Sequence, residues 1–363
     1  MTAHFHALTI ARVQRETPDA VSVIFEVPPG LAETYRYMQG QHLTLRAQVE
    51  GQELRRSYSI CSGVDDASLR IAIKAVDDGA FSQWANERLE PGMALDVMAP
   101  DGRFFTALHP GQRKHYVAFA AGSGITPVLS LIKTTLRQEP LSQFTLVYGN
   151  RTVGSILFGE ELEDLKDRYM QRFTLHHVLS REMQDVPLFN GRIDGDKCRG
   201  LLSTILPPED IDEVFICGPG QMLDDVRDAL VAGGIDAAHI HVERFLTPGE
   251  YHPARVPVTP PPMAAPDAPA ADVTVIADGV TRTLRVPYTG TSILDAALAA
   301  GADLPFACKG GVCCTCRARV LEGEVKMDRN YSLEPHELAR GFVLSCQSHP
   351  VSDRVVISYD ERL

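Results

Sequence analysis

The sequence predicts a multidomain protein with an antiparallel β-barrel, an α/β domain built on a parallel sheet, and a smaller third domain. The chain has 363 residues, more than one ordinary hydrophobic core holds. Short strand-like segments fill its first part, whereas apolar strands and helical segments alternate after His115. A stretch with eight prolines, residues 246–272, then separates a last part of the chain from the rest.

The first part, residues 1–110, predicts the β-barrel. Its apolar or alternating runs are short, and turns rich in Gly, Pro and Asp separate them. Many short strands with such breaks are typical of an antiparallel barrel or sandwich. The predicted strands are Val21–Val27, His42–Gln48, Leu69–Ala75 and Ala94–Met98.

The second part, residues 111–246, predicts the α/β domain. Strands that alternate with helices form βαβ units, and such units build parallel sheets. The predicted strands are Tyr116–Ala120, Phe144–Tyr148, Thr174–Leu179 and Glu213–Cys217. The predicted helices are Pro127–Gln138, Glu160–Arg168 and Gly220–Ala232.

Residues 247–271 predict an extended linker, because a Pro/Ala-rich run neither pairs in a sheet nor continues a helix. The third domain therefore occupies residues 272–363. Its 12 Asp/Glu and 10 Lys/Arg give it a charge of −2, out of −12 for the whole chain. Long-range steering of a basic partner by this domain is thus expected to be weak.

The composition excludes several classes of protein. The chain is acidic and has no basic stripe, which argues against nucleic-acid binding. The N-terminus has no basic stretch followed by an apolar run, and the most apolar window, Tyr116–Ile132, is broken by Gly and Pro, so we expect neither a signal peptide nor a membrane span. Eight cysteines in a chain this long are not a secreted disulfide framework. Four of them crowd into residues 308–316. We therefore expect a metal site in a reducing compartment, the cytoplasm.

The cysteine loop gives the most specific pattern. Three cysteines follow the spacing C-x4-C-x2-C and a distant fourth completes a plant-type [2Fe–2S] ligand set: Cys308, Cys313, Cys316 and Cys346. Gly310 and Gly311 let the backbone curl and direct N–H groups at sulfur. The spacing assigns no iron to Cys314. The alternative is a structural zinc site, although zinc knuckles favour paired C-x2-C units and only one such pair is well placed.

A second motif predicts a flavin site. The tetrapeptide Arg56-Ser57-Tyr58-Ser59 resembles the RxYS motif of the ferredoxin–NADP reductase family. Arginine can pair with the flavin pyrophosphate, tyrosine can lie against the isoalloxazine, and Ser59 can hydrogen-bond near the redox-active nitrogen. The turn Gly79-Ala80-Phe81-Ser82 resembles the family's second phosphate contact, with Lys74 on the strand before it. The order of these elements favours FAD over FMN; alone, RSYS is also compatible with a surface strand and Lys74 with a solvated lysine.

A third motif, Ala121-Gly122-Ser123-Gly124-Ile125-Thr126-Pro127, follows the first strand of the α/β domain. It lacks the third glycine of the standard dinucleotide fingerprint. The two glycines still allow close approach to a phosphate, Thr126 suits an N-cap and Pro127 suits the first helical position. The loop resembles the reductase family's nucleotide loop; the alternative is a tight structural turn.

The last strand of this domain leads into Cys217-Gly218-Pro219, which resembles the family's CGP motif against the nicotinamide. Ser59 and Cys217 are thus candidate neighbours of the hydride path, and Cys217 is equally compatible with an inert buried thiol. The chemistry belongs to the cofactors, so we expect no acid–base dyad. Glu243 and Phe245 are candidates near the flavin, with a surface glutamate and a core phenylalanine as alternatives. Cys61 and Cys198 are expected to be small buried hydrophobes.

Two arginines predict the preference for NADPH. No acid directly follows the second strand, at the kind of position where NAD enzymes usually place one for the ribose. Instead Arg151 follows the second strand, and Ser180-Arg181, similar to the family's SR pair, follows the third. Either arginine could also be a solvated surface residue.

The whole chain resembles the oxygenase reductases that carry a C-terminal ferredoxin. Residues 272–363, with VLEGEV and LEPHELARGFVLSCQSHP, resemble a plant-type ferredoxin, which implies a β-grasp (α+β) fold, a helix near Ser292–Ala300, and a short helix and strand before the last cysteine. The resemblance implies electron flow from NADPH to FAD, to the [2Fe–2S] cluster, and on to the di-iron hydroxylase subunits of a multicomponent oxygenase. The alternatives are a steroid or aromatic-ring hydroxylase as acceptor, or a non-catalytic [2Fe–2S] redox sensor.

Overall fold

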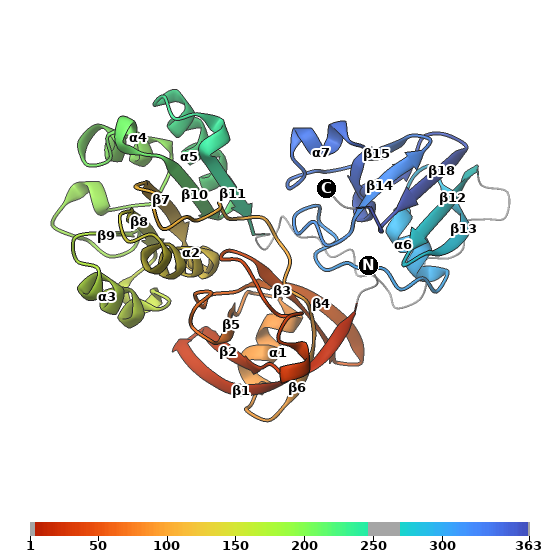
Figure 1. Ribbon diagram of the computed structural model, residues 1–363, viewed down its shortest axis with the longest axis horizontal. Coiled ribbons are helices and arrows are strands. Elements are labelled where there is room, and N and C mark those ends of the chain that lie inside the picture. The colour runs from red at the N-terminus through yellow and green to blue at the C-terminus, as the bar shows by residue number, and fades with distance from the viewer. Residues whose placement is uncertain (1–3, 246–268, 362–363) are drawn as a thin grey trace.

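The computed structural model describes residues 4–245 and 269–361, which contain three large sheets, a two-stranded ribbon and the helices that pack on them. Figure 1 shows a β-barrel, an α/β domain above it, and a third domain beside both. The predicted linker lies mostly outside the described residues. No helix in residues 4–245 or 269–361 is both long and apolar enough to cross a bilayer.

The first sheet is antiparallel and has the order β4-β3-β6-β1-β2-β5. A bridge between Ile60 and Ile71 connects the two edge strands and closes the sheet into a barrel around an apolar core. Its strands are β1 (Phe5–Thr17), β2 (Ala20–Glu26), β3 (His42–Val49), β4 (Gln52–Ser59), β5 (Leu69–Lys74) and β6 (Ala94–Met98). The predicted barrel is present, and β2, β3, β5 and β6 correspond to the four strands named from the sequence.

A short helix, α1 (Ala80–Arg88), packs against this barrel. The sequence predicted a turn over Gly79–Ser82, whereas the structure ends that turn at Gly79 and continues as helix. A Cβ at Gly79 would lie 2.3 Å from a Val76 methyl group, so only glycine fits there. Ser82 Oγ donates to the Gly79 carbonyl and accepts from the Val76 N–H, which holds the first turn in place.

The second sheet is entirely parallel, as predicted, in the order β11-β10-β7-β8-β9. Its strands are β7 (His115–Ala121), β8 (Gln143–Asn150), β9 (Phe173–Leu179), β10 (Glu213–Gly218) and β11 (Ile240–Arg244). The helices are α2 (Ile125–Gln138), α3 (Gly159–Arg168), α4 (Gly195–Thr204) and α5 (Gly220–Ala232). Neither β11 nor α4 was predicted. The order of strands reverses between β7 and β10, and open α/β sheets bind ligands at such a switch point.

The third sheet has the order β13-β12-β18-β14-β16, with β12 and β18 parallel. Its strands are β12 (Ala270–Ala277), β13 (Val280–Pro287), β14 (Arg317–Glu322), β16 (Phe342–Leu344) and β18 (Arg354–Ser358), and a small ribbon pairs β15 (Val325–Met327) with β17 (Ser348–Pro350). Helix α6 (Ile293–Ala299) packs against the sheet and α7 (Pro335–Ala339) precedes β16. The predicted β-grasp fold and its two helices are confirmed.

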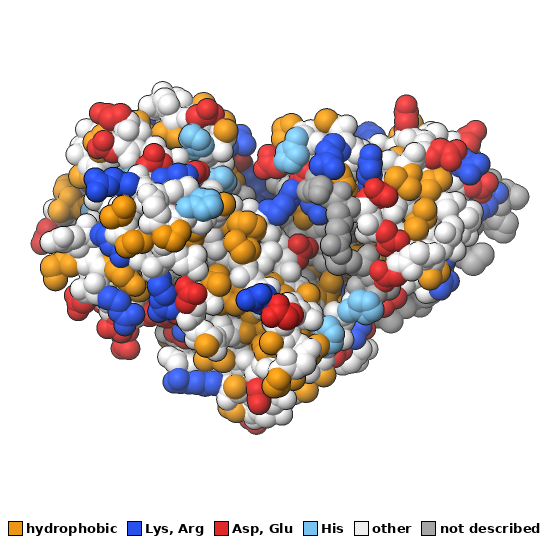
Figure 2. Space-filling view, in the orientation of Figure 1, with side chains coloured by type: hydrophobic (Ala, Val, Ile, Leu, Met, Phe, Trp, Pro, Cys, Tyr) orange, Lys and Arg blue, Asp and Glu red, His pale blue; other side chains and the backbone are white. Residues whose placement is uncertain are grey.

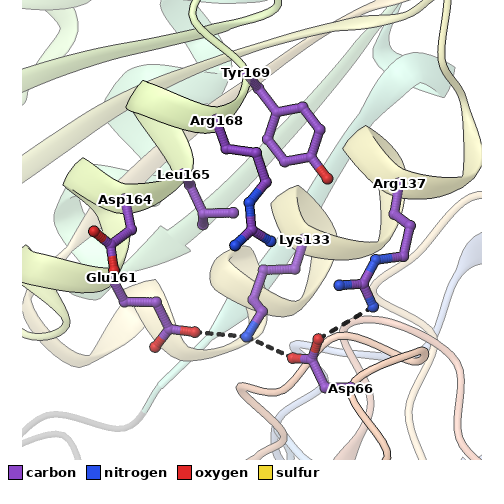
Figure 3. A pocket seen from close by; sticks show the side chains of 8 residues that line it. All are labelled: Asp66, Lys133, Arg137, Glu161, Asp164, Leu165, Arg168 and Tyr169. Carbon is purple, nitrogen blue, oxygen red and sulfur yellow. Dashed lines mark hydrogen bonds and ion pairs between the residues drawn. The ribbon is translucent and has the colours of Figure 1, made fainter.

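Ion pairs join the barrel to the α/β domain (Figure 3). Lys133 of α2 lies 2.5 Å from both Asp66 of the barrel and Glu161 of α3. Arg137 also pairs with Asp66, and Arg70 of β5 pairs with Glu161. The cavity at this junction is small, about 150 Å³, and the carboxylates Asp66 and Glu161 in its wall already have cationic partners. We interpret these ion pairs as contacts that hold the two domains together, and the cavity between them as a gap rather than a ligand site.

Candidate functional site

The two predicted nucleotide loops lie side by side at the switch point. The loop after β7 contains Gly124, and a Cβ built there would lie 2.1 Å from the Cys217 carbonyl oxygen at the end of β10. Only glycine fits this close approach. A Cβ at Gly218 would likewise lie 3.2 Å from Cβ of Ala121. The structure therefore brings the AGSG and CGP motifs together.

The start of α2 differs from the prediction. We expected Thr126 to be the N-cap and Pro127 to be the first helical residue. Instead a single 3₁₀ turn, Gly122–Gly124, leads directly into the helix at Ile125, and Gly124 is the N-cap. Thr126 Oγ1 donates to the Ser123 carbonyl, 3.0 Å away, from inside the first turn. The helix still begins at this loop, so its N-terminal dipole favours an anion there.

Ser59 and Glu243 meet at the junction of the barrel and the α/β domain. Ser59 Oγ, at the end of β4, donates to Glu243 Oε2 of β11 at 3.2 Å. Burial raises the pKa of Glu243 to about 8, although the hydrogen bond from Ser59 opposes this. The sequence left two interpretations of Glu243 open, and the structure places its carboxyl at the site.

Cys217 lies on the strand next to Glu243, at the paired position of the parallel ladder. Its side chain is fully buried. Burial and the carboxyl of Glu243 raise the pKa of the Cys217 thiol far above its ordinary value. The thiol therefore stays protonated and is a neutral neighbour of the loop rather than a nucleophile. Phe245, by contrast, packs against the hydrophobic core of the α/β domain.

The flavin motifs lie on neighbouring elements of the barrel. The rings of Tyr58 on β4 and Phe81 on α1 are 5.8 Å apart, so the RSYS strand contacts the GAFS turn. Arg56 is partly buried on the same strand, two residues before Tyr58 and therefore on the same face. Lys74 forms an ion pair with Asp19 at 3.4 Å, which gives it a partner within the barrel.

Arg151 and Arg181 are brought together at the carboxyl ends of β8 and β9. The Arg181 N–H donates to the Arg151 carbonyl at 2.8 Å, and the Ser180 N–H donates to the Asn150 carbonyl at 3.0 Å. All three predicted residues are exposed, so their side chains can reach a ligand at this edge. Two exposed guanidinium groups on adjacent strand ends fit a phosphate.

The four predicted cysteine ligands converge as two pairs. The Cys308 and Cys313 thiols lie close enough to shift each other's pKa, and so do those of Cys316 and Cys346. Among the residues that the structure describes, no three Cys, His, Asp or Glu side chains surround a single ion position. Two pairs of sulfur ligands fit the two irons of a [2Fe–2S] cluster better than one tetrahedral zinc.

Backbone N–H groups of the loop point at these sulfurs. The Gly310 N–H donates to Cys308 Sγ at 3.3 Å, and with the Cys313 thiol it lowers the pKa of Cys308 to about 6. Gly311 has a φ of 79°, a conformation that favours glycine. Cys346 lies in a single 3₁₀ turn after β16, just beyond the predicted strand. Such N–H groups stabilise thiolates and the negative charge of a cluster.

Three family models cover most of the chain. A model described as an oxidoreductase FAD-binding domain matches residues 7–106. One described as an oxidoreductase NAD-binding domain matches residues 119–228, and one described as a 2Fe-2S iron-sulfur cluster binding domain matches residues 275–351. Fold and site thus define an NAD(P)H-dependent oxidoreductase of the ferredoxin-reductase type, with FAD and a [2Fe–2S] cluster.

Relatives that match along nearly their whole length show which family within this class the chain belongs to. The chain is 49% identical over 358 residues to one component of 1,2-phenylacetyl-CoA epoxidase from Escherichia coli, covering 99% of this chain and 98% of the relative. It is 37% identical to the ferredoxin reductase component of 3-ketosteroid-9-alpha-monooxygenase from Mycobacterium tuberculosis, covering 99% and 97%. The chain belongs to the family of oxygenase reductase components. Phthalate dioxygenase reductase has the same fold, with a TM-score of 0.60, 24% identity and 98% of both chains covered.

Sequence reasoning missed the residues that connect the third domain to the other two. Arg55, the residue before the flavin motif, contacts Phe306, and Arg103 contacts Glu337. Each contact joins residues more than 200 positions apart, and no local pattern marks them. The one signal in the sequence is that two of these residues lie next to motifs: Arg55 directly precedes the flavin motif, and Phe306 lies two residues before Cys308.

Proposed function

We propose that this reductase supplies electrons to a multicomponent oxygenase of the phenylacetyl-CoA epoxidase type, and so serves aerobic phenylacetate breakdown. The observation that carries the proposal is the 49% identity along the whole chain, with the three cofactor domains in the same polypeptide. The partner would then be the di-iron hydroxylase subunits. Dependence on a pyridine nucleotide and eight cysteines without a disulfide among the described residues favour the cytoplasm as the place of action.

The flavin would be held by the barrel, residues 1–110. Arg56 would pair with the pyrophosphate, assisted by backbone N–H groups at Gly79–Ser82, and Tyr58 would lie against the isoalloxazine. Lys74, already paired with Asp19, would contribute little. Ser57 completes the motif; its hydroxyl lies 3.1 Å from that of Thr44 on β3 and anchors the strand.

The nucleotide would enter at the switch point of the domain formed by residues 111–246. Gly122, Ser123, Gly124 and Thr126 would face its phosphates at the start of α2. Arg151, Ser180 and Arg181 would take the 2′-phosphate, which favours NADPH over NADH. Gly218 and Pro219, after Cys217, would lie against the nicotinamide.

Bound FAD takes up a hydride as an electron pair, and the [2Fe–2S] cluster takes up electrons singly. Around these groups the protein's own residues bind and orient. Ser59 and Glu243 would lie beside the hydride-accepting edge, and the buried Cys217 thiol would be a neutral neighbour of the nucleotide loop. The cysteine pairs Cys308–Cys313 and Cys316–Cys346 would ligate one iron each.

The test is reconstitution with purified oxygenase subunits. With those of the epoxidase, we expect NADPH oxidation to be coupled to epoxidation of phenylacetyl-CoA; with those of a 3-ketosteroid monooxygenase, we expect uncoupled or slow turnover. Reduction of cytochrome c by NADPH serves as the control that the reductase is intact. Active cytochrome c reduction without epoxidation would refute the assignment of the partner.

A steroid or aromatic-ring hydroxylase is the second candidate acceptor, supported by the 37% identity to the ketosteroid monooxygenase component. Faster coupled turnover with that oxygenase would favour it. The redox-sensor hypothesis is disfavoured, because FAD- and NAD-binding domains supply a hydride-accepting half that a sensor does not need.

A further inference from the structure

Arg103 links the barrel to the ferredoxin domain, here defined as residues 269–361. It follows β6, and its Nη1 lies 2.6 Å from Glu337 Oε2 at the start of α7. Its Nη2 also donates to the Ser332 carbonyl at 3.2 Å and contacts Cys314 Sγ at 3.5 Å. One guanidinium group therefore engages three different groups of the ferredoxin domain.

The Arg103–Glu337 pair has the features of a strong ion pair. Glu337 is fully buried, whereas the Arg103 side chain is 35% exposed. Arg103 and Arg317, together with the N–H of Glu334 that the carboxylate accepts, lower the pKa of Glu337 despite its burial. If Arg103 were removed, Glu337 would keep Arg317 at 2.9 Å, so the ferredoxin domain itself would remain folded.

The contact reaches the cluster loop directly. Cys314 lies between the ligands Cys313 and Cys316 but belongs to neither sulfur pair. Its thiol donates to Ser332 Oγ at 3.0 Å, and that hydroxyl donates in turn to the Gly311 carbonyl at 3.3 Å. Arg103 thus holds the same loop segment that curls around the predicted iron site.

A second arginine supports the same arrangement from the flavin strand. Side chains alternate along β4, so Arg55 points away from the face of Arg56. Its guanidinium lies 4.2 Å from the ring centre of Phe306 and donates to the Leu304 carbonyl at 3.4 Å. Phe306 precedes Cys308 by two residues. Figure 2 shows Lys and Arg side chains gathered on the part of the ferredoxin lobe that faces the α/β domain.

We propose that Arg103 is a positioning residue that docks the cluster loop against the flavin domain and thereby sets the rate of electron transfer from flavin to cluster. The inference rests on the proposed electron route. In this step one electron passes from the reduced flavin to a ferric iron, which becomes ferrous, and no bond forms or breaks between the two domains. The contact is an ion pair whose cation, Arg103, is partly exposed. We therefore expect added salt to weaken the contact.

The experiment uses the full-length protein loaded with FAD and cluster. In Arg103→Ala and Arg103→Glu, stopped-flow reduction of the flavin by NADPH and ferricyanide reduction should match the wild type. Reduction of the cluster should slow about tenfold in Arg103→Ala, equivalent to about 1.4 kcal/mol, and more in Arg103→Glu. Arg103→Lys should recover part of the rate. Arg36→Glu is the matched control, since Arg36 is an exposed arginine of the same barrel.

Two further readouts separate docking from a structural defect. Amide hydrogen exchange over residues 331–340 should speed up in Arg103→Glu, while iron content and the EPR spectrum of the reduced cluster stay unchanged. Raising the salt concentration should slow cluster reduction in the wild type but hardly in Arg103→Ala. An unchanged cluster-reduction rate, or lost iron in every Arg103 variant, would overturn the proposal. Failure of the wild type to reduce its flavin or its oxygenase would instead count against the proposed function.

Discussion

Replacing Glu243 by Gln should remove the pH dependence of flavin reduction. The pKa of Glu243 is raised to about 8 by burial, and the Cys217 thiol on the paired strand stays protonated because its pKa is raised well above its ordinary value. A neutral carboxyl beside Ser59 is compatible with negative charge that arrives with the hydride, whereas a carboxylate opposes it. Flavin reduction should therefore slow as the pH rises through 8.

The size of the effect follows from the pKa. At pH 7 about one tenth of the wild-type molecules would carry the carboxylate, and at pH 9 about nine tenths would. The rate of flavin reduction should thus fall about tenfold between these values in the wild type. Glu243→Gln stays neutral, so it should match the wild type at pH 7 and keep its rate at pH 9.

The assay is anaerobic stopped-flow reduction of the flavin by NADPH from pH 6 to pH 9.5. Glu87→Gln, an exposed glutamate of α1, is the control for loss of a negative charge elsewhere. An identical pH profile for wild type and Glu243→Gln would refute the reasoning. The same carboxyl binds a proton in the folded state that the unfolded state releases above its ordinary pKa of 4.5. Stability should therefore fall as the pH rises from about 4.5 to about 8, and less so in Glu243→Gln.

Other sites give sharper yes-or-no outcomes. Cys313→Ser should abolish the EPR signal of the reduced cluster but leave NADPH-to-ferricyanide activity largely intact; loss of both would mean that the domains are not separable modules. Arg181→Ala should raise KM for NADPH about tenfold and leave KM for NADH nearly unchanged, and an equal effect on both nucleotides would exclude a 2′-phosphate contact. Gly124→Ala should lose NADPH binding, measured by titration, because its Cβ would lie 2.1 Å from the Cys217 carbonyl; unaltered binding would show that the two loops can separate.

The parts of the site that could be predicted from the sequence are motifs whose key residues lie close together in the chain. The cysteine loop and the CGP turn are each specified within ten residues, because their ligands or backbone must converge locally. The helix α1 was missed for the opposite reason: Gly79-Ala80-Phe81-Ser82 has the composition of a turn, and the helix beyond it depends on packing against the barrel. Strand β1 was not among the strands named from the sequence, and polar residues fill most of its outward positions.

The special environments of Glu243 and Glu337 could not be predicted from the sequence, because they depend on long-range contacts. In the sequence, neither glutamate belongs to a motif that sets it apart from the other glutamates of the chain. Burial raises the pKa of Glu243, and this burial arises where β11 pairs with β10 and the carboxyl meets Ser59, 184 residues earlier. Glu337 is buried only because arginines from two domains surround it. The tertiary structure creates the surroundings that shift the pKa of each carboxyl, so no local residue pattern predicts the shift.

The two interfaces of the barrel differ in a way that suits the proposed route. Toward the α/β domain, Lys133 is shared by two carboxylates, and Arg70 and Arg137 add further ion pairs. Ser59 of the barrel also donates a hydrogen bond to Glu243 across this interface, beside the proposed hydride site. Toward the ferredoxin domain, the described contacts of the barrel rest chiefly on Arg55 and Arg103. Hydride transfer needs atoms held within a few tenths of an ångström, so a multiply paired seam fits it. Electron transfer tolerates looser geometry, and a cluster that must later serve a separate oxygenase is better held by a few polar contacts that can be exchanged.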